Sequence, residues 1–331
     1  MALTDKLTAI GDAIRYKTGG TSTLTLSEMP NAIKSIEGGG SSGGETNTSL
    51  WTNGSWEEIQ NVLNRYYSEE ISDLSPYFNV GDKRQITISA IEAGTDLTDA
   101  HEETVIDAVI IGIEHDDLET PVSDNRTKSA LTIQLFHLMN VNGMYDTFPG
   151  NTNTSTCANY ATYTNTKRRK WLNQNFYNAL PIEMQPMIKP VVKKQARGIN
   201  NNKYLSSSYK TLFTSTEKVF LLSYTEVFSG HPKTVNEDDG VQYDYYKNRY
   251  NFVHWKQNES ERYISNWWCR TSIVYATGSG SSTTKYARYY FFTYNGDSYN
   301  STNAPSGLCP AWCLWFSSWQ IDNPMLNLSH S

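Results

Sequence analysis

The chain contains 331 residues with a formal net charge of −6, and 13% of its residues are aromatic, among them 22 tyrosines. The acidic balance argues against a dedicated nucleic-acid-binding protein, because such proteins carry a basic surface. No apolar run approaches the roughly 18 residues of a membrane span, and the first residues lack the pattern of a signal peptide. We therefore expect a protein that is made in a cytoplasm, binds no nucleic acid and has no membrane span.

The first 37 residues form a separate segment of the sequence. Leu3, Leu7 and Ile10 recur at helical spacing, and a pair of glycines ends this helix. Residues 38–49 are rich in glycine and serine, which is typical of a flexible linker. Because short amphipathic helices bury little surface alone, we expect residues 1–37 to be an oligomerisation or docking module.

The remainder combines a few helical patterns with many short β patterns. Residues 50–75 are expected to be a connecting segment with a helix over residues 56–67, which has Trp56 and Ile59 on its apolar face. Residues 108–113 are almost continuously apolar, which indicates a central strand. This mixture predicts the α+β class. Further helices are expected at residues 129–139 and 165–179, and strands at residues 85–90, 104–114, 188–194 and 218–223 and in the segment after residue 264.

The cysteines and the charged motifs give little indication of chemistry. Four cysteines are too few for a disulfide scaffold, and Cys309 and Cys313 lack the spacing and histidine partners of a zinc site. We expect all four to be buried thiols. The motif at residues 115–117 (His-Asp-Asp) follows a strand and is expected to be a solvated turn, with cation binding as the alternative. Residues 237–240 (Glu-Asp-Asp-Gly) are likewise expected to be a solvated acidic turn, because they lack the spaced oxygen ligands of a calcium loop.

No catalytic motif is present. The pattern Gly-x-Ser-x-Gly occurs only within the glycine- and serine-rich linker at residues 38–44, which does not have the strand-to-helix turn of a nucleophile elbow. No glycine-rich phosphate loop is followed by a helix. Residues 167–170 (Lys-Arg-Arg-Lys) are expected to be the solvated face of a helix, with contact to a phosphate-rich wall polymer as the alternative. We predict no enzymatic activity, no cofactor and no bound metal.

A series of short motifs in the second part of the chain has a familiar order and spacing. They are residues 78–82, 110–115, 170–173, 179–181, 219–223, 226–228, 242–243, 267–270 and 307–314. Together they resemble the C-type-lectin-like domains of phage tail and prophage proteins, including targets of diversity-generating retroelements. Two motifs depart from the family pattern, because Cys269 replaces a leucine and Leu308-Cys309 replaces Val-Arg. Residues 7–19 also look like modules at the start of phage tail and fibre proteins.

The resemblance implies that residues 76–331 form one ligand-binding domain, with two helices on a small antiparallel sheet and a variable surface near the C-terminus. It implies a non-enzymatic receptor-binding protein of the phage tail, made in a bacterial cytoplasm and located in the virion for host attachment. The implied partners are phage tail components and a host cell-surface protein or glycan. A homo-oligomer is also implied, as a trimer by analogy with fibre proteins.

The sequence between Tyr286 and Asn303 supports a binding surface independently. Five tyrosines and three asparagines lie within this window, and tyrosine and asparagine supply adaptable contacts in antibody paratopes. We expect Tyr290 to point outward, Tyr289 and Phe291 to point inward, and at least one ring of the preceding Trp-Trp pair to be in the core. The expected ligand-binding residues are Tyr275, Tyr286, Arg288, Tyr290, Tyr294, Asn295, Asp297, Tyr299, Asn300, Ser301 and Asn303.

Two alternative functions remain open at this point. A tail-associated polysaccharide hydrolase needs two carboxylates across a cleft, and Glu217, Glu226, Glu237 and Asp244 are available, although no pattern selects a pair. A structural tail protein would use the tyrosine-rich face for assembly instead of host contact.

Overall fold

The computed structural model describes residues 49–93, 100–139, 143–144, 157, 160–200, 211–230, 239–248, 266–277, 284–293, 296–301 and 305–315. Contacts within the chain divide it into two units, Met1–Thr48 and Ser49–Ser331. All described residues belong to the second unit. The predicted module at residues 1–37, and the linker up to residue 48, therefore lie outside the described residues.

Helix α4 (Trp56–Tyr67) has the predicted position and a clear local cause. The side chain of Ser55 accepts a hydrogen bond from the backbone N–H of Glu58, and the Glu58 carboxylate accepts one from the backbone N–H of Ser55. This capping box satisfies donors that the first turn would otherwise leave unpaired. The apolar face is buried through Ile59, Val62, Leu63, Tyr66 and Tyr67, and the short helix α3 (Leu50–Asn53) precedes it.

The first sheet has five antiparallel strands in the order β1-β2-β3-β12-β7. Strand β2 has an inner position, as its apolar sequence predicted, and its residues 108–111 are fully buried. Strand β12 is the last strand in the chain, yet it lies between β3 and β7. The bounds are β1 (Lys83–Ile88), β2 (Thr104–Ile113), β3 (Leu131–Leu135), β7 (Val219–Phe220) and β12 (Ala311–Leu314).

The second sheet also has five strands, in the order β10-β9-β8-β5-β6. Its pairs are antiparallel except for β5 and β8, which run parallel. The structure thus has two five-stranded sheets, where one small antiparallel sheet was expected. The bounds are β5 (Val191–Asn200), β6 (Thr211–Glu217), β8 (Trp267–Thr277), β9 (Thr284–Thr293) and β10 (Gly296–Ser301), and a separate pair joins β4 (Gly143–Met144) to β11 (Pro305–Ser306).

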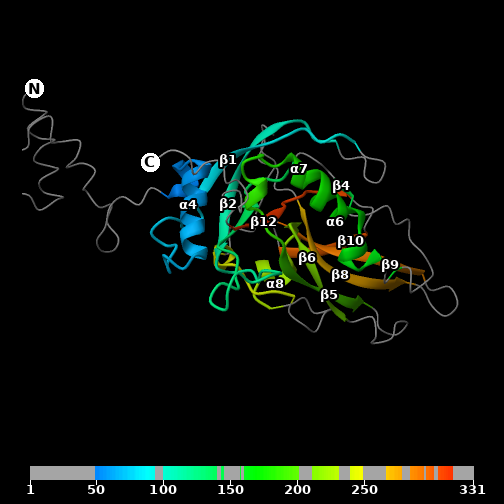
Figure 1. Ribbon diagram of the computed structural model, residues 1–331. Helices are drawn as coiled ribbons and strands as arrows, with labels where there is room; N and C mark the ends of the chain where they lie inside the picture. The colour runs from blue at the N-terminus through cyan, green and yellow to red at the C-terminus, as the bar shows by residue number, and fades with distance from the viewer. Residues whose placement is uncertain are drawn as a thin grey trace, which may run out of the picture. The chain divides into compact units, whose positions relative to one another are not determined.

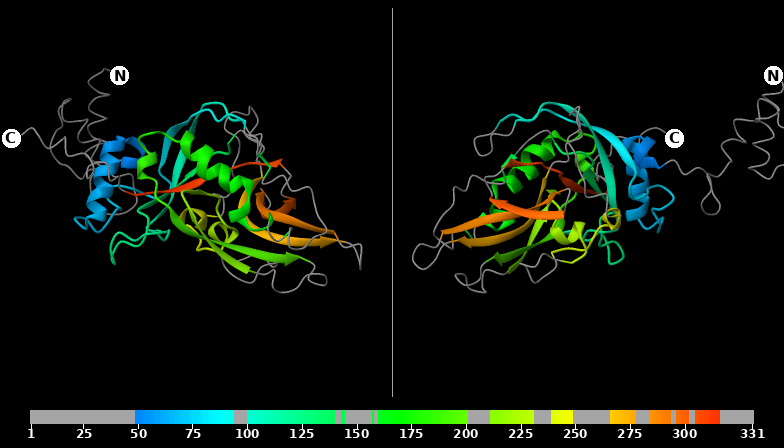
Figure 2. Two further views of the ribbon diagram at one scale, coloured as in Figure 1. Left: turned by 45° about the vertical axis from the view of Figure 1, so that its right-hand side comes forward. Right: turned by 180° about the vertical axis from the view of Figure 1, so that it is seen from behind.

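The predicted helix at residues 165–179 is confirmed, with a wider π-helical turn in its middle. It comprises α6 (Lys167–Trp171), the π-helical turn Leu172–Phe176 and α7 (Tyr177–Ala179). Helix α4 lies at the opposite end of this unit from the β8–β9 hairpin (Figures 1 and 2). The shorter helical segments are η1 (Tyr163–Asn165), η3 (Gln185–Met187), α8 (Tyr224–Val227) and η6 (Asp244–Lys247).

These elements confirm the α+β class. Sheet predominates over helix among the described residues. Within the same residues, no helix has the length and apolar character needed to cross a membrane.

The helix predicted at residues 129–139 is wrong, because this segment contains strand β3. Leu131, Leu135 and Leu138 have helical spacing, but Leu131, Ile133 and Leu135 also alternate with the period of a strand. All five residues of β3 are buried, and β2 and β12 pair with its two edges. Local spacing in this segment fits both a helix and a strand, and pairing with the neighbouring strands favours the strand.

Candidate functional site

Three of the predicted ligand-binding residues form one cluster on the β8–β9 hairpin. Tyr275 of β8 pairs with Tyr286 of β9, and Ile273 of β8 pairs with Arg288 of β9. The guanidinium of Arg288 lies 4.0 Å from the centroid of the Tyr275 ring and 5.7 Å from that of Tyr286. All three side chains are half-buried. We call Tyr275, Tyr286 and Arg288 the tyrosine surface.

Strand β10 continues the sheet beside the tyrosine surface. Its backbone places Tyr299 opposite Tyr290, and Ser301 opposite Arg288. The predicted residues Asp297 and Asn300 belong to the same strand, while Tyr294, Asn295 and Asn303 lie outside the described residues.

The outward orientation predicted for Tyr290 is wrong, because helix α8 covers this part of β9. The ring of Tyr290 is buried and makes an edge contact with the ring of Tyr224, at a centroid distance of 5.6 Å. Tyr289 and Phe291 are buried as predicted, so both faces of β9 are covered at this point. The rings of Trp267 and Trp268 are both buried, which confirms their predicted place in the core.

A group of buried charges lies where the two sheets meet. The ammonium of Lys193 lies 2.5 Å from Asp116 Oδ1, 2.7 Å from Glu226 Oε1 and 2.9 Å from the hydroxyl of Tyr243. The guanidinium of Arg270 donates two hydrogen bonds of 2.7 Å to the two carboxylate oxygens of Glu226. We call Asp116, Lys193, Glu226 and Arg270 the charge cluster, which contains two carboxylates and two cations.

The charges of this cluster stabilise one another in their ionised forms. Burial alone would raise the pKa of Asp116, but the ammonium of Lys193 lowers it below its ordinary value. Burial likewise opposes ionisation of Glu226, but Arg270 and Lys193 lower its pKa. Burial would lower the pKa of Lys193, but the two carboxylates raise it. A lysine that stays protonated, with its three N–H groups already bonded, is poorly suited to act as a base or nucleophile.

The charge cluster connects elements that are distant in the sequence. Asp116 follows β2 of the first sheet, Lys193 and Arg270 belong to β5 and β8 of the second sheet, and Glu226 belongs to α8. Residues 115–117 are therefore not simply a solvated turn, because Asp116 is buried. The three polar residues gave no local sign of this burial, because Lys193, the cationic partner of Asp116, lies 77 positions away in the sequence.

A cleft of about 340 Å³ opens beside the charge cluster. Asp117 and Lys128 form an exposed ion pair at this cleft, with 2.6 Å between Oδ1 and Nζ. The ring of His115 stacks on Tyr243 at a centroid distance of 3.9 Å. Val192, Lys194, Asp239, Gly240 and Val241 complete the lining together with the cluster residues Asp116, Lys193 and Glu226.

Two more charged motifs differ from their predicted solvated state. Asp239, in the expected acidic turn at residues 237–240, is fully buried and accepts a hydrogen bond of 2.5 Å from the hydroxyl of Thr271. Arg168 is also fully buried, whereas Lys170 of the same basic motif is exposed. The solvated face predicted for residues 167–170 is therefore only partly correct.

The carboxylates considered for hydrolysis have ionic partners where they are described. Glu217 is buried, and its carboxylate lies 2.7 Å from Nε of Arg169. Burial raises the pKa of Glu217 although Arg169 opposes this shift. Glu226 belongs to the charge cluster, and Asp244 forms an exposed ion pair with Lys247. Glu237 lies outside the described residues.

The four cysteines are free and buried, as predicted. Burial raises the pKa of the thiols of Cys269, Cys309 and Cys313. Among the described residues, no group of three or more histidine, cysteine, aspartate or glutamate side chains is arranged to hold a metal ion.

Comparison with known proteins identifies one family. Residues 138–315, which are more than half of the chain, match the model of a domain of unknown function, DUF6273. This match contains the whole tyrosine surface and all of the charge cluster except Asp116. No curated protein matches the chain, and no solved structure matches it. The chain therefore belongs to the DUF6273 family.

Proposed function

We propose that this protein is a non-enzymatic ligand-binding protein of a phage tail or prophage particle. In this proposal a C-type-lectin-like scaffold presents the tyrosine surface and the neighbouring strand β10 to a host cell-surface protein or glycan. The same proposal has three further parts. A retroelement diversifies the tyrosine- and asparagine-rich window, the protein is located in the virion, and it assembles as a homo-oligomer with other tail components.

The observation that carries the proposal is the assembly of the tyrosine surface from two strands. Tyr275 and Tyr286 are brought into register on the β8–β9 hairpin, with the guanidinium of Arg288 beside both rings. A few residues carry most of the binding energy of protein interfaces, and tyrosine and arginine are enriched among them. A tyrosine side chain has only two torsion angles, so binding of a ligand to these rings causes little loss of side-chain entropy.

The charge cluster gives the proposal further support, because it holds the strands of the second sheet in place. Lys193 of β5 bonds to Glu226 of α8 and to Asp116, which follows β2 of the first sheet. Arg270 of β8 also bonds to Glu226. A strand held by several buried charge-assisted hydrogen bonds is well suited to present a surface that changes in sequence. The described carboxylates Glu217 and Glu226 are each bound by arginine, which gives no support to the hydrolase alternative.

The test is binding of the purified protein to intact cells of the bacterium whose phage or prophage encodes it. Replacing Tyr275 and Tyr286 together with alanine should weaken binding by about a thousandfold, since each of the two interface anchors contributes on the order of 2 kcal/mol and about 1.4 kcal/mol corresponds to a factor of ten. The melting temperature should change little, because both rings are half-buried.

Tyr177→Ala is the matched control, because Tyr177 is also half-buried and also has a cation, Lys218, 4.4 Å from its ring centroid. It lies on α7, away from the β8–β9 hairpin, and should leave cell binding unchanged. Equal binding by the double variant and the original protein would refute the proposed surface. Absence of cell binding together with defective particle assembly would favour the structural role instead.

A further inference from the structure

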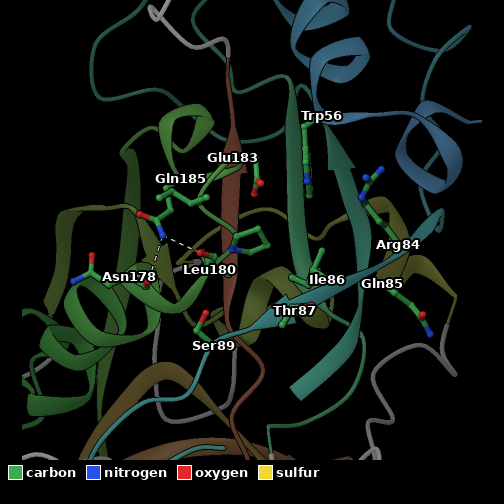
Figure 3. A pocket seen from close by; sticks show the side chains of 12 residues that line it. Trp56, Arg84, Gln85, Ile86, Thr87, Ser89, Asn178, Leu180, Glu183 and Gln185 are labelled. Carbon is green, nitrogen blue, oxygen red and sulfur yellow. Dashed lines mark hydrogen bonds between the residues drawn. The ribbon is translucent and has the colours of Figure 1, made fainter. Parts of the chain in front are cut away.

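Strand β1 is an edge strand of the first sheet, and a groove of about 510 Å³ runs beside it. Figure 3 shows Arg84, Gln85 and Thr87 of β1 together with Glu183 and Gln185 of the segment that follows α7. We call this cavity the β1 groove. It lies in the first sheet, apart from the tyrosine surface, and the inference below does not depend on the proposed function.

The hydrogen bonds of the sheet define which backbone groups of β1 point into the groove. The N–H of Ile110 in β2 donates to the carbonyl of Asp82, and the N–H of Phe136 donates to the carbonyl of Asp107, which pairs with Gln85. Because bonding direction alternates along an antiparallel strand, Arg84 and Ile86 bond to β2. The N–H and C=O groups of Gln85 and Thr87 therefore point away from β2.

These outward backbone groups have no partner in the part of the chain that the structure describes. No hydrogen bond is made by the backbone of Gln85 or Thr87 on this side. The next outward donor, the N–H of Ser89, is bonded to the carbonyl of Ala179 at 2.9 Å. The edge of β1 is therefore already hydrogen-bonded to a backbone carbonyl at Ser89. It is open at the two preceding positions that face the groove, Gln85 and Thr87.

The opposite wall of the groove is held in place by its own hydrogen bonds. The side-chain amide of Gln185 donates to the carbonyls of Asn178 and Leu180, at 3.2 and 2.8 Å (Figure 3). Ile182 projects from this wall and is 75% exposed. An apolar side chain with this exposure, beside an open strand edge, offers a contact for an apolar residue of an added strand.

Arg84 does not make the groove an anion site. Its guanidinium stacks over the ring of Trp56 at 4.2 Å and donates to the carbonyls of Trp51 and Gly54. The complementary chemistry is therefore that of an extended peptide backbone, with alternating N–H and C=O groups. Pairing of β1 with β1 of a second copy fits less well. In each copy the segment that follows α7 lies beside β1, and the two segments would obstruct each other.

We infer that the β1 groove binds an extended peptide segment of a partner protein as an additional strand. The segment pairs with the backbone of Gln85 and Thr87 and places an apolar side chain against Ile182. This mode of recognition gives affinity through main-chain hydrogen bonds and specificity through alternate side chains.

The experiment selects a displayed library of random peptides on the immobilised full-length protein. An enriched peptide is then synthesised, and its affinity is measured by fluorescence anisotropy. Thr87→Pro removes the outward N–H and should weaken binding about tenfold or more, because the peptide carbonyl loses its donor. Proline is tolerated at an edge position whose N–H faces away from the sheet. Thr87→Ala keeps the N–H and should bind nearly as well as the original protein, whereas Ile182→Asp should bind more weakly.

N-methylation of the peptide gives a second test that leaves the protein unchanged. Every second backbone N–H of the bound peptide faces β1, so methylation of these nitrogens should abolish binding. Methylation of the other set of alternate nitrogens should be tolerated. The inference is overturned if no peptide is enriched, if Thr87→Pro and Thr87→Ala bind equally well, or if methylation of either set has the same effect.

Discussion

Lys193 and Asp116 form an ion pair between the two sheets, with 2.5 Å from Nζ to Oδ1 and with both side chains almost completely buried. Asp116 lies three positions after the end of β2, the longest strand of the first sheet, and Lys193 is in β5, the strand of the second sheet that runs parallel to β8. Because both side chains are buried, removal of either partner leaves an uncompensated buried charge between the two sheets.

Lys193→Met should lower the free energy of unfolding by about 3–5 kcal/mol, because it leaves the buried carboxylates of Asp116 and Glu226 without their shared ammonium. Urea unfolding followed by circular dichroism measures this change. Lys128→Met is the control, since the exposed pair of Lys128 and Asp117 is worth roughly 0–1 kcal/mol. Similar losses of unfolding free energy in the two variants would contradict the expectation that the buried ion pair contributes more than the exposed one.

The stability of the protein should fall in acid through the charge cluster. The folded pKa values of Asp116 and Glu226 lie below their ordinary values, so the unfolded chain binds protons first as the pH decreases. Their contribution is complete above the unfolded pKa values and is lost as the pH falls through the folded ones. Asp116→Asn should therefore show a shallower decline between neutral and acidic pH in urea titrations. An unchanged slope in Asp116→Asn would contradict this source of acid sensitivity.

Gly307→Ala should destabilise the protein by about 1–3 kcal/mol through overpacking. A Cβ at this position would lie 2.6 Å from Cδ1 of Leu138 and 2.8 Å from the carbonyl oxygen of Asn266. That carbonyl cannot easily move, because it accepts the backbone N–H of Gly307 itself at 2.8 Å. Thermal unfolding measures the effect, and an unchanged melting temperature would show that the backbone has more space here than the structure gives it.

The thiols of Cys269, Cys309 and Cys313 should not react with a chromogenic disulfide reagent in the folded protein at neutral pH. Burial both blocks access and raises their pKa, so little thiolate is present. All should react once the protein is unfolded in guanidinium chloride. Rapid reaction of Cys309 or Cys313 before unfolding would contradict the burial of these thiols.

Elements with a local cause could be predicted from the sequence. The bounds of α4 follow from the Ser55–Glu58 capping box and the apolar face that begins directly after it. The burial of β2 follows from its apolar run, because a strand flanked on both edges and covered on both faces has no polar side. In each case the neighbouring residues contain enough information.

Features that depend on distant residues could not be predicted in this way. The polar sequence at residues 115–117 has no local sign of the buried ion pair, because Lys193 is separated from Asp116 by 77 positions. Tyr290 had the alternation of an outward residue, but α8, which covers it, is formed by a segment more than 60 positions earlier. The side chain of Tyr286, in the same strand, remains half-buried because this covering contact does not extend to it.

The place of β12 has a consequence for synthesis of the protein on the ribosome. Residues 311–314 form the strand between β3 and β7, so the first sheet lacks an inner strand until these residues have left the exit tunnel. Until then β3 and β7 have unpaired edges that invite pairing with other nascent chains. A premature stop before Ala311 therefore removes far more than four residues of sheet, and we expect such products to be recovered with chaperones or in aggregates.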